Sequence, residues 1–170
     1  MRKPHSLRAH LTAATPELRT DPDKIAIYIK GGKLVPAGAS SISFEYRYTL
    51  VLVALDYRSH ADAVIVPLMA WLRTHQPEIL DNPELRERSV RFEAEYLNNE
   101  TMDLSIEIDL TEAVVVRPGP KPDAQETARR YTVTHPDEPG RVGVPTEASH
   151  WEVWFHGELI AEWDFAPPHI

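Results

Sequence analysis

The stretch that decides the fold of this chain runs Ser43-Phe44-Glu45-Tyr46-Arg47-Tyr48-Thr49-Leu50-Val51-Leu52-Val53-Ala54-Leu55. Up to Thr49, aromatic and polar residues alternate, which is the pattern of a β-strand with one buried face and one wet face. From Leu50 to Leu55 every residue is apolar, which predicts a strand covered on both faces. We therefore expect one long strand that starts near a solvated edge and becomes central in a sheet.

Three further segments alternate as strands do. Ile25 to Ile29 has one apolar face, and Gly31-Gly32 after it predicts a tight hairpin turn, because glycine accepts positive φ freely. Leu34-Val35 then returns as a short partner strand. Val90 to Ala94 and Met102 to Leu110 predict an antiparallel hairpin with one apolar and one acidic face.

One segment has the spacing of a helix. Between Ala61 and His75, an apolar stripe recurs at helical intervals and can cover the sheet; it consists of Val64, Ile65, Leu68, Met69 and Leu72. Pro67 must lie in the first turn of this helix or kink it. The predicted class is α+β: an antiparallel or mixed β-sheet with helices packed on it, plus a C-terminal β-hairpin arm.

The chain of 170 residues fits one domain with appended segments. Residues 1–117 carry the α+β core pattern. Residues 118–149 are Pro-rich and irregular, as a linker or arm would be, with Asp123 to Arg130 compatible with a short helix and Tyr131 to Thr134 with a short strand. Residues 150–170 form the aromatic β-hairpin and tail.

The hairpin gathers three of the four tryptophans around Gly157. A three-residue loop from His156 to Glu158 pairs Phe155 with Leu159 and keeps one face apolar, whereas a two-residue loop would mix glutamates into that face. An isolated hairpin is marginal in water, so it must dock on something. We expect it to dock on a neighbouring subunit, the alternative being its own domain. The candidate interface residues are Trp151, Trp154, Phe155, Ile160 and Trp163, with Trp154 pointing outward beside Ile160.

Composition excludes several classes. A net charge of −8 argues against broad nucleic-acid binding. The absence of cysteine excludes disulfides and zinc–cysteine sites. No apolar run approaches the roughly 20 residues of a membrane span, and none forms a usual secretory signal, so we expect no membrane partner and synthesis in the cytosol.

The acidic face is the one candidate for catalysis. Paired carboxylates can act as acid and base or hold a hard metal ion, but they must converge in a pocket. Here they would spread over an outer sheet face, so a solvated or subunit-facing surface is favoured; the residues are Glu93, Glu95, Asp103, Glu107 and Asp109. The chain has no HExxH, nucleophile-elbow or P-loop pattern. We expect no catalytic, cofactor or metal residues; the alternatives are a small carboxylate-dependent hydrolase and a monomeric adaptor that binds peptides through the tryptophan hairpin.

Several short motifs extend across residues 3–117. They are Lys3-Pro4, Ser6-Leu7-Arg8, Pro16-Glu17-Leu18, Ser43 to Leu50, Val66-Pro67-Leu68, Trp71-Leu72-Arg73, His75-Gln76-Pro77, Leu97-Asn98-Asn99 with Thr101, and Leu110-Thr111-Glu112. In these motifs, and more loosely in the tryptophan hairpin, the chain resembles the tail completion protein R (GpR) family of contractile-tailed temperate phages.

The resemblance implies a structural role and a fold like that of tail terminators. Such a protein would complete the head-proximal end of the tail in the virion, after assembly in the host cytoplasm. It would form a ring, six-membered because contractile tails are six-fold objects, that caps the tail tube and sheath and joins the head-completion or connector protein. The family implies no catalytic residues.

Overall fold

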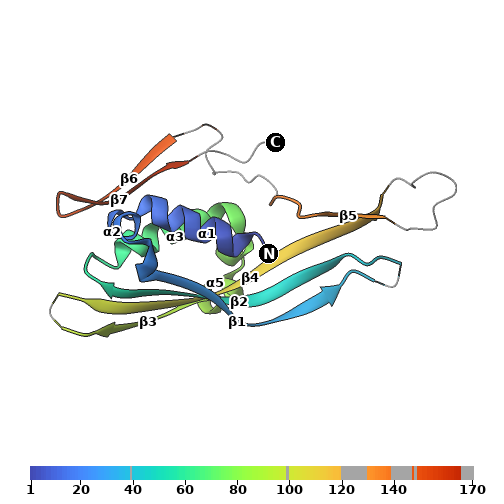
Figure 1. Cartoon of the computed structure of the whole chain (residues 1–170), viewed down its shortest axis with the longest axis horizontal. Coiled ribbons are helices and arrows are strands. Elements are labelled where there is room, and N and C mark those ends of the chain that lie inside the picture. The colour runs from blue at the N-terminus through green and yellow to red at the C-terminus, as the bar shows by residue number, and fades with distance from the viewer. Residues whose placement is uncertain (39, 99, 120–129, 139–146, 148, 166–170) are drawn as a thin grey trace.

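The structure is a computed structural model that describes residues 1–38, 40–98, 100–119, 130–138, 147 and 149–165. These residues form three layers: a β-sheet, two main helices across one of its faces, and a β-hairpin over the helices (Figure 1). The elements are α1 (Lys3–Ala14), α2 (Pro16–Thr20), η1 (Pro22–Lys24), β1 (Ile25–Pro36), β2 (Phe44–Tyr57), α3 (Asp62–His75), α4 (Glu78–Asp81), α5 (Pro83–Arg88), β3 (Val90–Tyr96), β4 (Met102–Pro118), β5 (Tyr131–Thr134), β6 (Ser149–Phe155) and β7 (Glu158–Phe165).

The sheet has the strand order β1-β2-β4-β3, with β5 pairing the far end of β4. All of its strand pairs are antiparallel. The long strand predicted from Ser43 to Leu55 is β2, and it lies between β1 and β4, which confirms its central place. The α+β class is confirmed as well, with an antiparallel sheet.

The burial of β2 confirms most of the prediction for its apolar half. Leu50, Leu52 and Ala54 are fully buried beneath the helices. Val51 is buried on the opposite face, where Tyr28 and Glu107 flank it on the neighbouring strands. The prediction is wrong for Leu55. This residue is 46% exposed, because it lies near the end of the strand on the face that the helices do not cover.

Gly31-Gly32 is not a hairpin turn, contrary to the prediction. β1 continues through both residues to Pro36, with a bulge between Ile29 and Gly31. A Cβ at Gly32 would lie 2.9 Å from the Cβ of Tyr48 on β2. Glycine is therefore needed here because the two strands approach closely, and not because the chain turns.

Helix α3 accommodates Pro67 in its interior, where proline removes the hydrogen bond to the carbonyl four residues earlier. That carbonyl belongs to Ala63, and the hydroxyl of buried Thr15 donates to it at 3.0 Å. The residue after α1 thus replaces the missing bond. The Pro67 position also fixes α3 against α1, because His10 of α1 lies 3.0 Å from the Pro67 carbonyl.

The core lies between the sheet and these two helices. Helix α1 contributes Leu7 and Leu11, and α3 contributes Leu68 and Leu72. The facing side of the sheet contributes alternate residues of β2 and β4, as antiparallel strands with one covered face do: Leu50, Leu52, Leu104, Ile106 and Ile108.

The hairpin register was predicted in part. Trp151 pairs with Trp163 and Val153 with Ala161, as expected. The turn, however, has two residues, His156 and Gly157, both with positive φ. A bulge at Ile160 shifts the register by one residue, so a two-residue turn is compatible with an apolar inner face.

The hairpin docks on its own chain. Strand β7 contacts α1, α2 and α3, and Ala161 and Trp163 are buried there. The expectation that the hairpin docks on a neighbour instead is therefore wrong for this inner face. The division of the chain into a core of residues 1–117 and appended segments stays a prediction.

The Pro-rich stretch contains the predicted short strand. Tyr131 to Thr134 is β5, and it pairs with β4 from Val115 to Pro118. The short helix suggested from Asp123 to Arg130 falls outside the described residues, apart from Arg130.

Candidate assembly surfaces

A buried carboxylate holds the start of α1 on the sheet. Glu112 of β4 points to the helix side, and it accepts a hydrogen bond from the Tyr48 hydroxyl and one from the backbone N–H of Arg2 at 2.6 Å. Burial, and then the hydrogen bond to Glu112, raise the pKa of Tyr48. A negative charge at a helix N-terminus is favourable, since the first N–H groups have no helical partner.

A second chain of hydrogen bonds continues from Lys3. Its ammonium group donates to Gln76 and to Glu138, both at 2.7 Å. The Gln76 side chain in turn donates to the Thr111 hydroxyl at 3.0 Å and accepts from the Thr111 backbone N–H at 3.1 Å. Side chains from α1, the end of α3 and β4 thus form one polar cluster.

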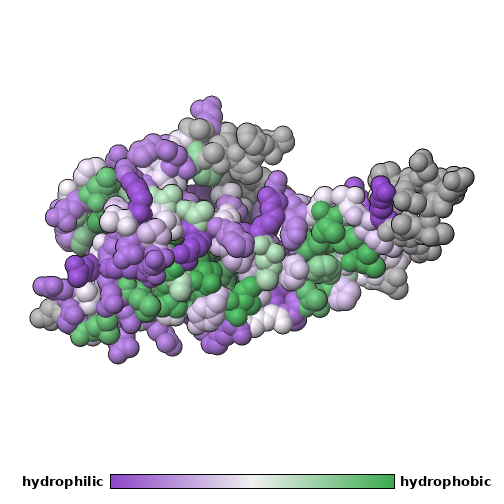
Figure 2. All heavy atoms as spheres, viewed as in Figure 1, coloured by the Kyte–Doolittle hydropathy of each residue, from purple (hydrophilic) through white to green (hydrophobic). Residues whose placement is uncertain are grey.

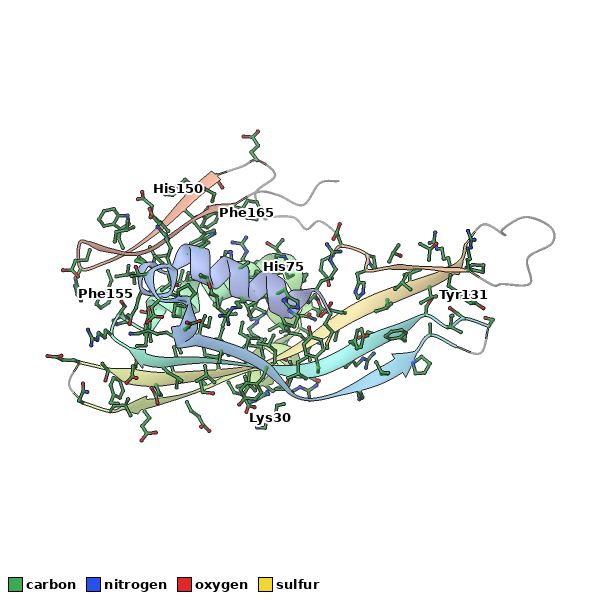
Figure 3. All side chains as sticks on the ribbon, viewed as in Figure 1. Lys30, His75, Tyr131, His150, Phe155 and Phe165 are labelled. Atoms are coloured by element: carbon green, nitrogen blue, oxygen red, sulfur yellow. The ribbon has the colours of Figure 1, made fainter. Side chains whose placement is uncertain are left out.

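Ser6 connects this cluster to the aromatic end of α3. The indole of Trp71 donates to the Ser6 hydroxyl at 3.1 Å, and the ring of His75 stacks on that indole at 4.4 Å. Figure 3 shows His75 beside α1. Burial lowers the pKa of His75. Trp71, which lies off the predicted apolar stripe, is buried because α3 is covered by α1 as well as by the sheet.

Residues from six of the motifs therefore meet in one place. They are Lys3, Ser6, Trp71, Gln76 and Glu112, joined by Tyr48 of the central strand. A pocket of about 300 Å³ lies beside them, lined by Arg2, Lys3, His75, Glu112, His135 and Glu138. Because Lys3 and Glu112 are already bonded within the chain, the cluster is an internal brace for α1.

Glu17, from another motif, has a similar structural role. Its carboxylate accepts from the Lys24 ammonium group at 2.6 Å and from the backbone N–H groups of Arg58 and Ser59. These bonds fix the loop between β2 and α3. The structural role of Glu17 is therefore enough to explain the Pro16-Glu17-Leu18 motif, and no ligand contact is needed to explain it.

The acidic face predicted from β3 and β4 is the outer face of the sheet, opposite the helices, where Figure 3 shows Lys30. Glu107 is 2.6 Å from the Lys30 ammonium and 3.4 Å from the Arg91 guanidinium. Asp109 is 2.9 Å from Arg91 and accepts from the Thr49 hydroxyl at 2.7 Å.

These partners neutralise Glu107 and Asp109, two of the five carboxylates of the acidic face. The hydrogen bond from Lys30 lowers the pKa of Glu107, and that from Arg91 lowers the pKa of Asp109. Both groups are therefore acceptors rather than proton donors at neutral pH. No group of three or more His, Asp or Glu side chains suited to a metal occurs among the described residues.

The structure separates the five hairpin candidates. Trp163 is buried and edge-on to His10 at 5.7 Å, and Trp151 stacks on Trp163 at 5.8 Å. Phe155 stacks on His60 at 4.2 Å at the hairpin tip, while Ile160 is half-buried. Trp154 is 58% exposed and donates only to neighbouring Glu152. Trp154 is thus the outward aromatic that the alternation predicted.

Two larger features were not predicted. The ends of β1, β2 and β4, together with β5, extend past the helices as an arm (Figure 1). At the opposite end, the hairpin tip and the β3–β4 turn border a hollow of about 600 Å³.

Glu112 belongs to one of the motifs, but no role of its own was predicted for it from the sequence. It follows the apolar alternation from Met102 to Leu110 at a position where an apolar residue is expected, and this interruption is a sequence signal of a buried charge. No helix within the described residues is long and apolar enough to cross a membrane.

The comparisons with known proteins agree with one another. The family model for P2 phage tail completion protein R (GpR) matches residues 1–139. The chain is 35% identical over 164 residues to the tail completion protein R of Escherichia phage P2, covering 96% of this chain and 99% of that protein. No solved structure matches the chain significantly.

This chain belongs to the phage tail completion protein R family. It is accordingly a structural protein of phage tail assembly that associates with other tail components, and its family is not one of enzymes. The carboxylate-dependent hydrolase considered from the sequence has no support in the paired charges of Glu107 and Asp109.

Proposed function

We propose that this protein closes the head-proximal end of a contractile phage tail. It forms a ring, six-membered to match the tail, that caps the tail tube and sheath and then joins the head-completion or connector protein. Assembly takes place in the host cytoplasm, and the ring is retained in the virion neck. The observation that carries the proposal is the 35% identity to a tail completion protein over 96% of this chain.

The architecture supports a scaffold role. The buried polar groups of the α1 brace are bonded to the chain itself, and the outer-face carboxylates of Glu107 and Asp109 are paired with Lys30 and Arg91. What the chain offers a partner is its surface: exposed aromatics, the arm and the hollow. Extensive exposed apolar surface typically marks protein contacts.

We propose Trp154 as one anchor for a neighbouring tail component. It lies on the face of the hairpin turned away from α1 and α3, and its indole combines apolar area with one donor. Exposed tryptophans of this kind often dominate binding energy at interfaces. Phe155 and Ile160 are proposed as members of the same interface, whereas Trp163 and Trp151 serve internal packing.

The test uses phage lysates that lack a functional copy of this gene. Supplying the full chain should restore complete tails and infectivity, and cryo-electron microscopy of these tails should place a ring of this chain at the head-proximal end. Glu93→Gln with Glu107→Gln serves as a control for hidden catalysis and should complement unless that face lies in a contact. Density for this chain elsewhere along the tail would contradict the proposal.

A further inference from the structure

The arm carries an exposed apolar tip. We define the arm tip as residues 33–38, 40–47, 113–119 and 130–134. Leu34 on β1 is 61% exposed, and Ile42, Tyr131 and Val133 are each at least half exposed. Figure 2 shows hydrophobic side chains gathered on the arm near β5, at a distance from the main body.

The arm tip is positively charged, although the chain has a net charge of −8. It contains Lys33, Arg47, Arg117 and Arg130 against Glu45, which gives a net charge of +3. Glu45 is paired with Arg47 at 3.0 Å. Lys33 and Arg117 make no ion pair with any described residue, so their charges are available to a partner.

The opposite end of the molecule has the complementary properties. We define the hollow end as residues 55–60, 93–98, 100–104 and 155–159. Its hollow of about 600 Å³ is lined by Tyr57, Tyr96, Met102, Phe155 and Leu159, among others. Tyr96 is 76% exposed. Figure 3 shows Tyr131 of the arm tip and Phe155 of the hollow end at opposite extremes of the fold.

The hollow end is strongly acidic. It contains six carboxylates against one guanidinium, a net charge of −5: Asp56, Glu93, Glu95, Glu100, Asp103 and Glu158 against Arg58. Arg58 lines the hollow, whereas Glu93, Glu95 and Asp103 point to the outer face of the sheet. Glu100 and Glu158 lie on the wall of the hollow itself. Neither makes an ion pair among the described residues.

We propose that the arm tip of one copy inserts into the hollow end of the next copy. Apolar side chains such as Leu34 and Tyr131 would fill the hollow beside Tyr96 and Phe155, while Lys33 and Arg117 meet the acidic rim. Opposite potentials of this kind steer association and fix the register of a contact. This inference rests on the proposed ring, for which it names the contacting surfaces.

The charges also decide the symmetry of the contact. Pairing two arm tips, or two hollow ends, about a two-fold axis would place like charges together, which is unfavourable. Arm tip to hollow end is a heterologous contact, which closes into a ring or grows as a filament. A cap built in this way uses both ends of each subunit and leaves no free arm.

Two charge-reversed variants of the full chain test this contact. The arm variant carries Lys33→Glu with Arg117→Glu, and the hollow variant carries Glu100→Lys with Glu158→Lys. Each alone should weaken self-association at least about tenfold, measured by sedimentation at low ionic strength. Glu84→Lys with Glu87→Lys on α5, away from both ends, is the matched control and should assemble as wild type does. Thermal melting checks that each variant is folded.

Mixing gives the sharper result. The two variants together should co-assemble in alternation, because at every contact positions 33 and 117 of one chain then carry the charge opposite to positions 100 and 158 of the next. A chain carrying all four changes should assemble alone. Wild type that stays monomeric, reversals without effect, or a mixture that does not assemble would each overturn the contact. If the wild-type chain completes tails but the variants do not behave as expected, the proposed function survives and only the contact is wrong. A wild-type chain that completes no tails contradicts the proposed function itself.

Discussion

The hydroxyl of Tyr48 on β2 donates to the buried carboxylate of Glu112 on β4. The two residues are diagonal neighbours across the strand pair, because Tyr48 lies opposite Leu110. The same carboxylate accepts from the Arg2 backbone, so one side chain links the central strand, its partner and the first helix. The motif residues of this protein thus stabilise the fold that holds its surfaces in place.

The Tyr48–Glu112 bond predicts a loss of stability in alkali. Burial and Glu112 raise the pKa of Tyr48, so the folded state keeps its phenol proton above pH 10, where an unfolded tyrosine ionises. The folded state then binds more protons than the unfolded state, and the free energy of unfolding falls as pH rises through about 10 and above. Denaturant titrations across this range should show the fall, and Tyr48→Phe should reduce it. An identical slope in both proteins would contradict this assignment.

At neutral pH the same variant tests the brace. Tyr48→Phe removes one donor from a buried carboxylate and should cost about 1–3 kcal/mol. Thr49→Val, on the outer face beside it, removes a hydrogen bond to partly exposed Asp109 and should cost less. Equal losses of unfolding free energy for the two variants in urea titrations would contradict the larger stabilising contribution expected of the buried Tyr48–Glu112 hydrogen bond.

The central strand is tested by a truncation in the core. Leu52 is fully buried between α1, α3 and its neighbours in the sheet, so Leu52→Ala should destabilise the fold by about 2–5 kcal/mol. Leu55→Ala provides the comparison, since Leu55 has the same chemistry on the same strand but is 46% exposed. Amide exchange should also be slowest from Leu50 to Ala54. Similar losses for the two leucines would contradict the difference in burial between Leu52 and Leu55.

The sequence patterns predicted the elements better than their arrangement. The alternation in β2 and β4 and the helical stripe of α3 are local signals, and all three elements form. The errors at Gly31-Gly32 and at the hairpin turn have a common cause. A glycine in the sequence shows only that unusual backbone conformations are allowed there. Whether the chain turns depends on the partner strand, through the close approach of Gly32 to Tyr48 and the bulge at Ile160. The arm and the hollow involve residues far apart in the chain, so no local pattern reveals them. The Lys3–Gln76 contact likewise required the fold.

Two half-buried histidines, His10 and His75, predict a loss of stability in weak acid. Burial lowers the pKa of His10 and of His75, so below about 6.5 the unfolded state takes up protons that the folded state does not. The free energy of unfolding should therefore fall between pH 7 and 5. His150 acts in the opposite direction, because Asp164 raises its pKa, but it is exposed and screened by solvent. His10→Gln should flatten the pH dependence of stability and His150→Gln should steepen it slightly; a slope unchanged by His10→Gln would contradict the account.

Two tryptophans of one hairpin separate folding from assembly. Trp163 is buried against α1, so Trp163→Ala should destabilise the monomer by about 3–5 kcal/mol. Trp154 is mostly exposed, so Trp154→Ala should change monomer stability by under about 1 kcal/mol while lowering the yield of complete tails. Melting of the free protein and complementation of tails lacking it measure the two effects independently. A Trp154→Ala chain that completes tails at the wild-type rate would remove this residue from the interface, and one that unfolds would show that the outer face of the hairpin also serves the core.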